Sequence, residues 1–485
     1  MSPPLAVTMV SPEVAPFART GGLGDVLGSL PVALERLGLR LTLITPAYRP
    51  ILHGNLPVED TGISFTVPIS TRQETGSLLT TTIGKGITVY FIRSDKYFDR
   101  DYLYGTPDGD YPDNAERFAF FSRAALEVLK LHPPDILHAH DWQSSLAIIF
   151  LKAKPQLYPR LSSVKTVFTI HNLGYQGIFP PQDWHLLNLD HRLFTPEYLE
   201  FWGKINLLKG GLIFADAITT VSPTYAEEIN TAEQGLGLEG VFQERADSLV
   251  GIMNGADYTV WNPETDRFIA ARFGSNRLSG KKVCKADLQR SFQLAPDPEV
   301  PVIGMVSRLA QQKGFDLLQE ALDELLSRNL QIVLLGTGDK RYRDFLADAA
   351  ARYPAKLAVR IAFDEPLSHK IIAGSDLLLM PSRYEPGGLI QLYGFKYGSV
   401  PIVRATGGLK DTVEEFNPGT GRGNGFVFSS YQAADLLAAV DRSLELFPQR
   451  ALWPTLVRNG MSADFSWERS ARLYLDLYQK LTAGS

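Results

Sequence analysis

Short runs of branched apolar residues alternate along this chain with turns and with segments of helical periodicity. We expect thirteen strands, most of them continuous runs of Val, Ile and Leu instead of alternations of apolar and polar residues. Parallel strands that are covered on both faces show this pattern. The expected strands lie at 5–10, 41–45, 87–92, 135–139, 165–170, 217–221 and 249–253, and then at 302–306, 332–335, 357–362, 376–380, 400–403 and 425–428.

Helical segments separate these strands. In one of them the apolar residues Leu318, Leu322 and Leu326 recur every four positions, as on one face of an amphipathic helix, and residues 118–130 have the same pattern. Strands that alternate with helices in both halves of the chain predict an α/β protein with two doubly wound, Rossmann-like domains. Weaker alternation at 63–69 and 78–83 predicts a hairpin inserted in the first domain.

We place the N-terminal domain at residues 1–262, the C-terminal domain at 263–463 and a last helix at 464–485. A polar and Pro-rich stretch at 261–298 is the expected crossing between the domains. In doubly wound sheets, ligands bind beyond the carboxyl ends of the strands. We therefore expect the functional site in a cleft between the two domains.

Composition excludes some classes of function. The 485 residues include 48 Lys and Arg against 53 Asp and Glu, a net charge of −5 that gives no reason to expect nucleic acid as a partner. The single cysteine, Cys284, excludes an intrachain disulfide and a Cys-based zinc site, and it fits a reducing compartment. With no apolar run of bilayer length and no signal peptide, we expect no membrane partner and a cytoplasmic location.

A glycine-rich segment directly follows the first expected strand. Thr20, Gly21, Gly22 and Gly24 open an amphipathic helix, so backbone amides there could bind an anion. The same glycines could simply form a tight turn between strand and helix. The spacing is not G-x-G-x-x-G, which disfavours a Rossmann dinucleotide site.

Two later strands end in histidines. His138 and His140 are two residues apart and share a strand face, with Asp141 next. This trio could bind zinc in a metal-dependent hydrolase, or it could be a buried histidine beside a capping carboxylate. The following strand ends in His171-Asn172-Leu173-Gly174-Tyr175, and polar and aromatic groups of this kind suit a polyhydroxylated ligand.

In the second half, cations and a carboxylate follow expected strands. Arg308 and Lys313 lie on one strand-to-helix loop, where they could hold a diphosphate or be solvated surface cations. Glu385 precedes the glycines that open another helix. Its carboxylate could accept hydrogen bonds from sugar hydroxyls while the amides of 387–390 meet phosphate, or it could cap that helix.

Eight segments in register over most of the chain resemble the starch and glycogen synthases that use ADP-glucose, which have the two-domain GT-B architecture. They are R-T-G-G-L-G-D-V, H-A-H-D-W, T-I-H-N-L-G-Y-Q-G, T-T-V-S-P-T-Y-A-E-E-I, N-G-A-D-x-x-x-W-N-P, S-R-L-x-x-Q-K-G, S-R-Y-E-P-G-G-L-I-Q-L and T-G-G-L-x-D-T-V.

The resemblance implies transfer of glucose from ADP-glucose to the non-reducing end of an α-1,4-glucan, starch or glycogen, with retention of configuration and without a metal or other cofactor. When the family's roles are carried over position by position, Arg308 and Lys313 would bind the diphosphate and Glu385 would bind the donor glucose. Asp141 and His171 would line the same pocket, with His171 near the 6-hydroxyl.

The resemblance also implies contacts with the donor and the acceptor outside this catalytic set. Donor contacts would come from Arg19, Gly21, Gly22, Asp25, Asn254, Phe363 (against the adenine), Gly387, Gly388, Leu389 and Ile390. Acceptor contacts would come from Trp142, Asn172 and Tyr175. The last helix, 464–485, would cross back to the N-terminal domain and take part in a hinge. In a plastid-bearing source the location would be the plastid stroma or the starch granule.

At three positions the chain departs from the family pattern. Arg19 replaces a lysine, which keeps the charge but substitutes a planar fork for a compact ammonium. Gly387 replaces a frequent cysteine, so the thiol is not needed for the chemistry. Phe363 replaces a frequent tyrosine and keeps the stacking face.

Other functions remain open from the residues alone. A UDP-sugar transferase or a glucan phosphorylase would use the same fold, the latter with a pyridoxal-phosphate lysine. The metal-dependent hydrolase on His138, His140 and Asp141 belongs to another class. A catalytically silent glucan-binding protein is a further alternative, disfavoured by the complete set of Arg308, Lys313 and Glu385.

Overall fold

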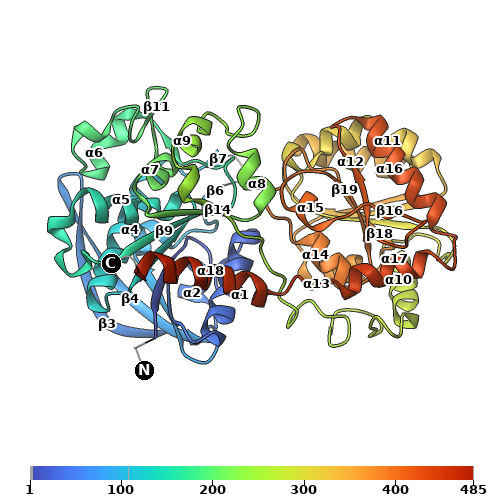
Figure 1. Cartoon of the computed structure of the whole chain (residues 1–485), viewed down its shortest axis with the longest axis horizontal. Coiled ribbons are helices and arrows are strands. Elements are labelled where there is room, and N and C mark those ends of the chain that lie inside the picture. The colour runs from blue at the N-terminus through green and yellow to red at the C-terminus, as the bar shows by residue number, and fades with distance from the viewer. Residues whose placement is uncertain (1–3, 107–108, 484–485) are drawn as a thin grey trace. The chain divides into compact units, whose positions relative to one another are not determined.

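The chain divides into two units, each with its own sheet and hydrophobic core (Figure 1). A computed structural model describes residues 4–106 and 109–483. The N-terminal unit holds the described residues up to Met253 and those from Trp467 onward, and the C-terminal unit is Asn254–Ser466. We expected the boundaries after residues 262 and 463. The first falls earlier because Ile252 packs into the N-terminal core, whereas Ala256 already packs with Trp261 in the other unit.

A nine-stranded sheet forms the centre of the N-terminal unit, in the order β14-β13-β9-β8-β1-β2-β5-β4-β3. The strands from β14 to β5 in this order are parallel to their neighbours, as their continuous apolar runs predicted. Their bounds are β1 Ala6–Val10, β2 Arg40–Pro46, β5 Ile87–Arg93, β8 Ile136–His140, β9 Lys165–Ile170, β13 Ala217–Thr220 and β14 Leu249–Gly251.

The predicted hairpin is the antiparallel edge of this same sheet. It consists of β3 (Glu59–Ile69) and β4 (Arg72–Ile83), and β4 pairs with β5. Val67 and Ile69 are buried while Thr66 and Pro68 are more exposed, which explains why β3 alternates and the central strands do not. Two short pairings were not predicted: a three-stranded sheet of β10 (Ile178–Phe179), β12 (Lys204–Asn206) and β11 (Glu200–Phe201), and the pair β6 (Gly105–Thr106) and β7 (Gly109–Asp110).

Helices cover both faces of the N-terminal sheet. The C-terminal helix α18 packs on this unit beside α1, where Trp467, Ala471 and Tyr474 are buried with residues of α1 and β1 (Figure 1). The helices of the unit are α1 Gly22–Arg36, α2 Arg49–His53, α3 Asp95–Phe98, α4 Asn114–Leu131, α5 Trp142–Ala153, α6 Trp184–Leu187, α7 Leu207–Phe214, α8 Pro223–Glu228, α9 Glu239–Glu244 and α18 Trp467–Ala483.

The C-terminal unit contains a six-stranded, wholly parallel sheet in the order β17-β16-β15-β18-β19-β20. The strands are β15 Val302–Val306, β16 Gln331–Gly336, β17 Leu357–Ile361, β18 Leu377–Met380, β19 Val400–Arg404 and β20 Phe426–Phe428. The helices are α10 Ser279–Ser291, α11 Phe315–Ser327, α12 Lys340–Arg352, α13 Glu365–Gly374, α14 Ile390–Lys396, α15 Gly407–Thr412, α16 Ala433–Leu446 and α17 Trp453–Ser462. The predicted amphipathic helix is α11, and its leucines are buried. Both units are thus Rossmann-like, which confirms the predicted fold class.

Candidate active site

A buried carboxylate that the sequence analysis missed binds the glycine-rich loop after β1 through hydrogen bonds. Glu13 accepts hydrogen bonds from the backbone N–H of Thr20 (2.6 Å), the Thr20 hydroxyl (2.6 Å) and the Tyr104 hydroxyl (2.7 Å). Burial raises the pKa of Glu13, against the lowering effect of these donors. An acidic residue three positions after a buried strand, in Ser11-Pro12-Glu13, was the available signal.

The predicted residues of this loop occupy its exposed side. Helix α1 starts at Gly22, no side chain caps its N-terminus at Gly21, and a methyl group placed on Gly21 would meet nothing within 4 Å. Arg19 and Asp25, both predicted near the donor, form an ion pair of 2.8 Å. The N-cap position of α1 therefore supplies no side-chain cap to the N–H groups of the first turn, and the partly exposed cation of Arg19 lies nearby. This arrangement suits an anionic ligand.

Asp141 follows β8 in a strained backbone conformation. Its φ of 57° and ψ of 175° lie in a region that non-glycine residues rarely adopt. The conformation lets its carboxylate accept a 2.7 Å hydrogen bond from the backbone N–H of His171, at the end of the neighbouring β9. Burial raises the pKa of Asp141 to about 7, although the N–H groups of His171 and Asn172 favour the ionised form. Such strain and such a shift are typical of functional carboxylates.

The three predicted histidines lie together. His140 Nδ1 is 3.1 Å from His171 Nε2, and the rings of His138 and His140 are 4.0 Å apart between centroids. Both ring nitrogens of His138 are occupied, Nδ1 by the Tyr478 hydroxyl of α18 (2.8 Å) and Nε2 by the Thr169 hydroxyl (2.5 Å). Burial lowers the pKa of His138 and of His171 to about 3, so both rings are neutral. His138 thus has a packing position in this arrangement, with both of its nitrogens hydrogen-bonded within the protein.

The predicted acceptor residues differ in exposure. Tyr175 is half exposed, and the Asn172 side chain accepts a 2.9 Å hydrogen bond from the Gly174 N–H. Trp142 is largely buried, with its ring 5.1 Å from that of Phe118 and 5.4 Å from that of Phe179. The structure therefore gives Trp142 a packing position, while Tyr175 faces solvent.

In the C-terminal unit, the structure brings together a cation and a carboxylate that are 72 residues apart in sequence. Lys313 Nζ lies 2.8 Å and 2.6 Å from the two carboxylate oxygens of Glu385, and the Ser382 hydroxyl donates a further 2.9 Å bond to Glu385. Both groups follow carboxyl ends of neighbouring strands, β15 and β18. The loops pack so closely that a methyl group on Gly314 would lie 2.0 Å from the carbonyl oxygen of Pro381. Glu385 is therefore paired with a cation. The helix that it was alternatively expected to cap, α14, begins five residues later, and no side chain at its N-cap position caps it.

The loop after Glu385 packs backbone to backbone on the second T-G-G sequence. A methyl group on Gly407 would lie 2.0 Å from the carbonyl oxygen of Glu385, and one on Gly408 would lie 1.9 Å from that of Gly387. Gly408 also donates its N–H to the carbonyl oxygens of Glu385 and Pro386 (3.1 Å each). The second T-G-G thus supports the predicted donor residues Gly387, Gly388, Leu389 and Ile390.

The remaining predicted residues of this unit follow strands or stand near its start. Arg308 is exposed after β15, and Phe363 is 70% exposed after β17, where its ring is accessible for stacking. Asn254, the first residue of the unit, is buried, and its side-chain oxygen has no hydrogen-bond partner. An unsatisfied buried acceptor is unusual and fits a residue that receives a ligand.

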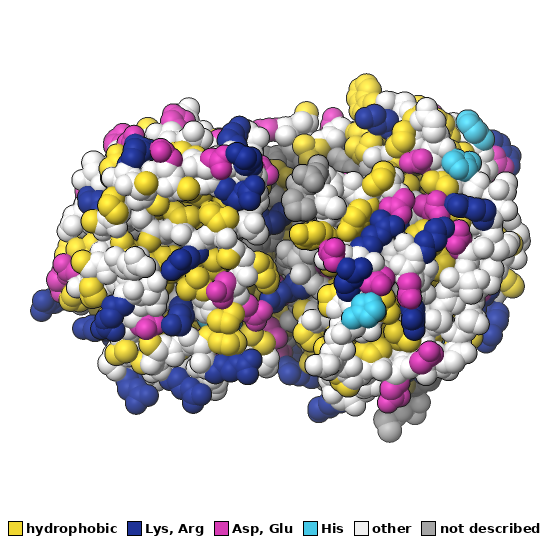
Figure 2. Space-filling view, turned by 180° about the vertical axis from the view of Figure 1, so that it is seen from behind, with side chains coloured by type: hydrophobic (Ala, Val, Ile, Leu, Met, Phe, Trp, Pro, Cys, Tyr) yellow, Lys and Arg dark blue, Asp and Glu magenta, His cyan; other side chains and the backbone are white. Residues whose placement is uncertain are grey.

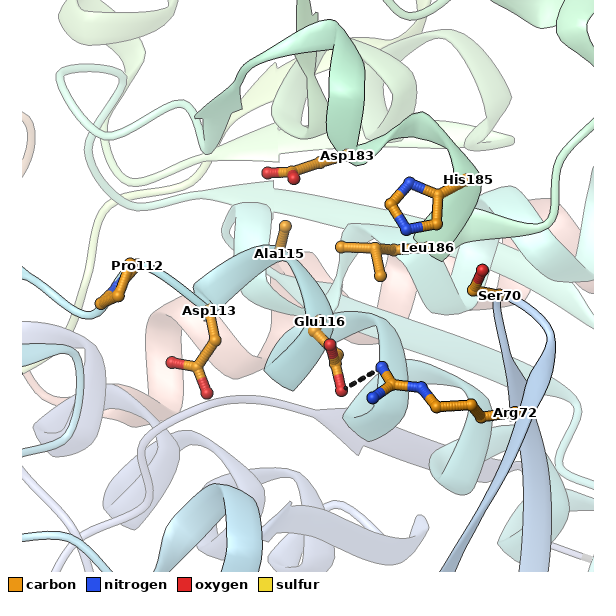
Figure 3. Close-up of a pocket in the computed structure, with 9 residues that line it drawn as sticks. All are labelled: Ser70, Arg72, Pro112, Asp113, Ala115, Glu116, Asp183, His185 and Leu186. Atoms are coloured by element: carbon orange, nitrogen blue, oxygen red, sulfur yellow. Dashed lines mark ion pairs between the residues drawn. The ribbon is translucent and has the colours of Figure 1, made fainter.

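Other features of the surface contain none of the predicted site residues. A pocket of about 520 Å³ in the N-terminal unit is lined by Glu116 of α4 and by Asp113 just before this helix, with Arg72 2.9 Å from Glu116 (Figure 3). Basic and acidic side chains of this unit are intermixed on the face in Figure 2. Among the described residues, no group of three or more His, Cys, Asp or Glu could hold a metal ion, and no helix is long and apolar enough to cross a membrane.

Comparison with known proteins identifies the family. Residues 6–244 match the model of the starch synthase catalytic domain, and residues 288–453 match that of glycosyl transferases group 1. The chain is 50% identical to glycogen synthase of Koribacter versatilis and 46% identical to glycogen synthase 2 of Geobacter sulfurreducens, in each case over 98% of both chains.

Solved structures agree with this assignment. The catalytic domain of starch synthase IV from Arabidopsis thaliana, bound to ADP and acarbose, matches with a TM-score of 0.91 and 34% identity over 99% of this chain and 100% of that one. Sucrose-phosphate synthase from Thermosynechococcus elongatus, with a TM-score of 0.63 and 17% identity over 99% of this chain and 100% of that one, shares the fold. The two Rossmann-like units, the full-length similarity and the family models together show that this chain is a glycosyltransferase of the starch and glycogen synthase family.

Proposed function

We propose that this enzyme transfers glucose from ADP-glucose to the non-reducing end of an α-1,4-glucan, with retention of configuration and without a metal or other cofactor. The Arabidopsis relative was solved with ADP and acarbose, which supports an adenine nucleotide donor and a glucan acceptor. The residues that would serve the donor lie mostly in the C-terminal unit, with the loop of Arg19, Gly21, Gly22 and Asp25 in the N-terminal unit. Those that would serve the acceptor lie in the N-terminal unit.

The pair of Lys313 and Glu385 is the observation that carries the proposal. A diphosphate that binds Arg308 would compete with Glu385 for Lys313 and leave the carboxylate free to accept hydrogen bonds from glucose hydroxyls. As the diphosphate departs, its growing charge is stabilised by the two cations. Positive charge that develops at the anomeric carbon is stabilised by the carboxylate. The pair thus supplies a cation for the departing diphosphate and a carboxylate for the positive charge at the anomeric carbon.

In the mechanism that we propose, the bond between the anomeric carbon and the phosphate oxygen breaks first. The acceptor 4-hydroxyl attacks the oxocarbenium-like centre from the face that the diphosphate leaves, which retains the configuration. Its proton passes to the departing phosphate. We infer no covalent intermediate on the enzyme. His171 is neutral because burial lowers its pKa to about 3, so it can hydrogen-bond a sugar hydroxyl without adding a competing charge.

The alternatives fit the site less well. A metal-dependent hydrolase would need His138, whose nitrogens are both taken by hydroxyls. A glucan phosphorylase would need a pyridoxal-phosphate lysine, whereas the full-length similarity of this chain is to glycogen synthases. Similarity to bacterial glycogen synthases supports the cytoplasm as the location.

Labelled glucose tests the proposal directly. We expect incorporation into glycogen from ADP-glucose well above that from UDP-glucose, unchanged by a chelator, with products that an exo-acting α-1,4 hydrolase degrades. Lys313→Ala should lower kcat about 100-fold or more, as loss of one charge-stabilising donor does. Equal rates from both donors would overturn the donor assignment, and normal turnover by the variant would overturn the role of Lys313.

A further inference from the structure

An exposed tryptophan occupies a turn that disfavours it. The strands β11 and β12 pair Phe201 with Lys204, so that Trp202 and Gly203 form a two-residue hairpin turn. Both have positive φ, 52° and 76°, which defines the mirror-image turn in which Asn-Gly is strongly preferred. A bulky residue at the first position is strained. Trp202 is nevertheless there, and it is 83% exposed.

Contacts on each side fix this turn. The Glu200 carboxylate accepts a 2.6 Å hydrogen bond from the Gly203 N–H. A second turn with positive φ, at Leu236 (50°) and Gly237 (85°), lies against the first. A methyl group on Gly237 would be 2.9 Å from the Phe201 ring and 3.6 Å from Trp202 Nε1. The glycine therefore lets the turns meet, and the indole N–H edge lies against Gly237, whose chain neighbour Leu236 is 46% exposed.

The two turns are tied to the strand-end loop that carries the predicted acceptor residues. Gln176 donates from Nε2 to the carbonyl oxygen of Leu236 (3.3 Å), and its Oε1 accepts a 2.6 Å hydrogen bond from Asn206 at the end of β12. The residue before Gln176 is Tyr175, which is half exposed. One buried amide thus joins the loop that carries Tyr175 to the two turns that carry Leu236 and Trp202.

We propose that Trp202, with Leu236 beside it, is a remote subsite that stacks against a glucose unit of a long acceptor chain. This inference rests on the proposed function and adds to it where a long glucan would be held. A glucose ring presents a flat face of C–H groups that suits an indole ring, and the indole N–H can donate to a hydroxyl. A second attachment point on the same chain raises the effective concentration of its reactive end.

The observations favour a sugar chain over a protein partner. The exposed apolar side chains here are two, Trp202 and Leu236, and they stand beside the charged residues Glu200 and Lys204. A stable protein interface needs a much larger contiguous area. The turn lies at the edge of the N-terminal unit, near the label β11 in Figure 1, where a long polymer can reach it.

Trp202→Asn is a suitable test because asparagine is the residue that the turn prefers, so folding should be kept or improved. We expect the KM for glycogen to rise about three- to tenfold, the loss of one stacking contact, while the KM for maltotriose changes by less than about twofold. Trp202→Phe should restore much of the affinity for glycogen. Leu157→Asn, which replaces another half-exposed apolar residue of the same unit, is the matched control and should leave both values unchanged.

Different experimental results would contradict the proposed function and the proposed subsite. If the wild-type enzyme transfers no glucose from ADP-glucose to either acceptor, the proposed function is wrong. If the wild-type enzyme is active and Trp202→Asn keeps the KM for glycogen, the subsite is wrong. An equal rise for maltotriose and glycogen would also overturn it, since the contact would then not be remote. A change in the mass of the particle in sedimentation, with unchanged KM, would identify the turn as a contact between copies of the chain instead.

Discussion

Three buried carboxylates of this enzyme have different partners. Glu385 faces the ammonium of Lys313, whereas Asp141 and Glu13 are held by N–H and hydroxyl groups alone. Burial disfavours the charge of an acid that lacks a cationic partner. It therefore raises the pKa of Glu13, and it raises that of Asp141 to about 7. The end of β8 in the N-terminal unit thus contains a carboxylate that changes charge near neutral pH.

Glu385→Gln separates a catalytic role from a structural one. The variant keeps the size and the hydrogen bond with Ser382 but removes the charge, so we expect kcat and kcat/KM to fall together by about 100-fold or more. Lys313 is partly exposed and can be solvated, so the melting temperature should change little. Asp441→Asn is the control, because Asp441 pairs with Arg328 on the surface of the same unit, where such a pair contributes about 1 kcal/mol or less. Normal turnover by Glu385→Gln with a lowered melting temperature would show that the residue is structural.

The raised pKa of Asp141 predicts a loss of activity on the acid side of the pH profile. If the ionised carboxylate is the active form, kcat/KM should fall as the pH drops below about 7. His171 should add no limb between pH 5 and 8, since burial lowers its pKa to about 3. In Asp141→Asn the limb should disappear along with most of the activity. A limb that persists unchanged in the variant would assign it to another group, and Glu13→Gln then tests the neighbouring buried carboxylate.

At the scale of elements, apolar periodicity predicted well the strands that are buried on both faces. All thirteen expected strands exist, within one or two residues of their predicted ends. The two- and three-residue strands β10, β11 and β12 were missed because so short a segment has no periodicity to read. Their pairing depends on turns, and one of these contains a tryptophan where turn rules predict asparagine. The inserted hairpin was predicted, but not that it would extend the main sheet, because pairing partners are not visible in a single sequence.

The two T-G-G sequences look alike and differ in structure. Gly21 has open space around it, whereas Gly408 packs directly on the carbonyl of Gly387. We expect Gly408→Ala to lower the melting temperature of the C-terminal unit by about 5 °C or more and to abolish activity by displacing the loop after Glu385. Gly21→Ala should fold normally and raise the KM for ADP-glucose about tenfold, because the added methyl group meets only the ligand. Gly240→Ala, at an equally open position of α9, should change neither property. An unaffected KM in Gly21→Ala would place the donor away from this loop.

At the scale of the whole molecule, α18 shows what sequence patterns leave undetermined. Its helical period was evident, but the buried contact of Tyr478 with His138 joins residues 340 positions apart. Glu13 was missed for a related reason, since its partner Tyr104 follows 91 residues later. Motifs located the strand ends at which the candidate site residues lie. They did not show which polar groups pair there, because pairing depends on tertiary packing.

Lowering the pH should change the free energy of unfolding of the N-terminal unit through two buried groups whose effects have opposite signs. The pKa of His138 falls from 6.5 to about 3 on burial, so its neutral form contributes stability above pH 6.5 that is lost as the pH falls toward 3. The pKa of Asp141 rises to about 7, so its contribution has the opposite sign and is lost as the pH rises from about 4 to 7. The two effects partly cancel in the wild-type protein, and single variants should reveal them.

We expect the destabilisation by His138→Asn to shrink as the pH is lowered from 6.5 to 5, by at most about 1.4 kcal/mol per pH unit, because the variant no longer excludes a proton that the unfolded chain binds. Asp141→Asn should show the reverse, with a destabilisation that shrinks as the pH rises toward 7, since the variant no longer buries an ionising carboxylate. Denaturant unfolding of the N-terminal unit at pH 5, 6 and 7 measures both slopes. Substitution of the exposed His132 by Asn serves as the control and should follow the wild-type slope. Parallel slopes for all three variants would mean that neither buried group changes its proton affinity on folding, and the acid limb predicted for Asp141 would then lose its physical basis.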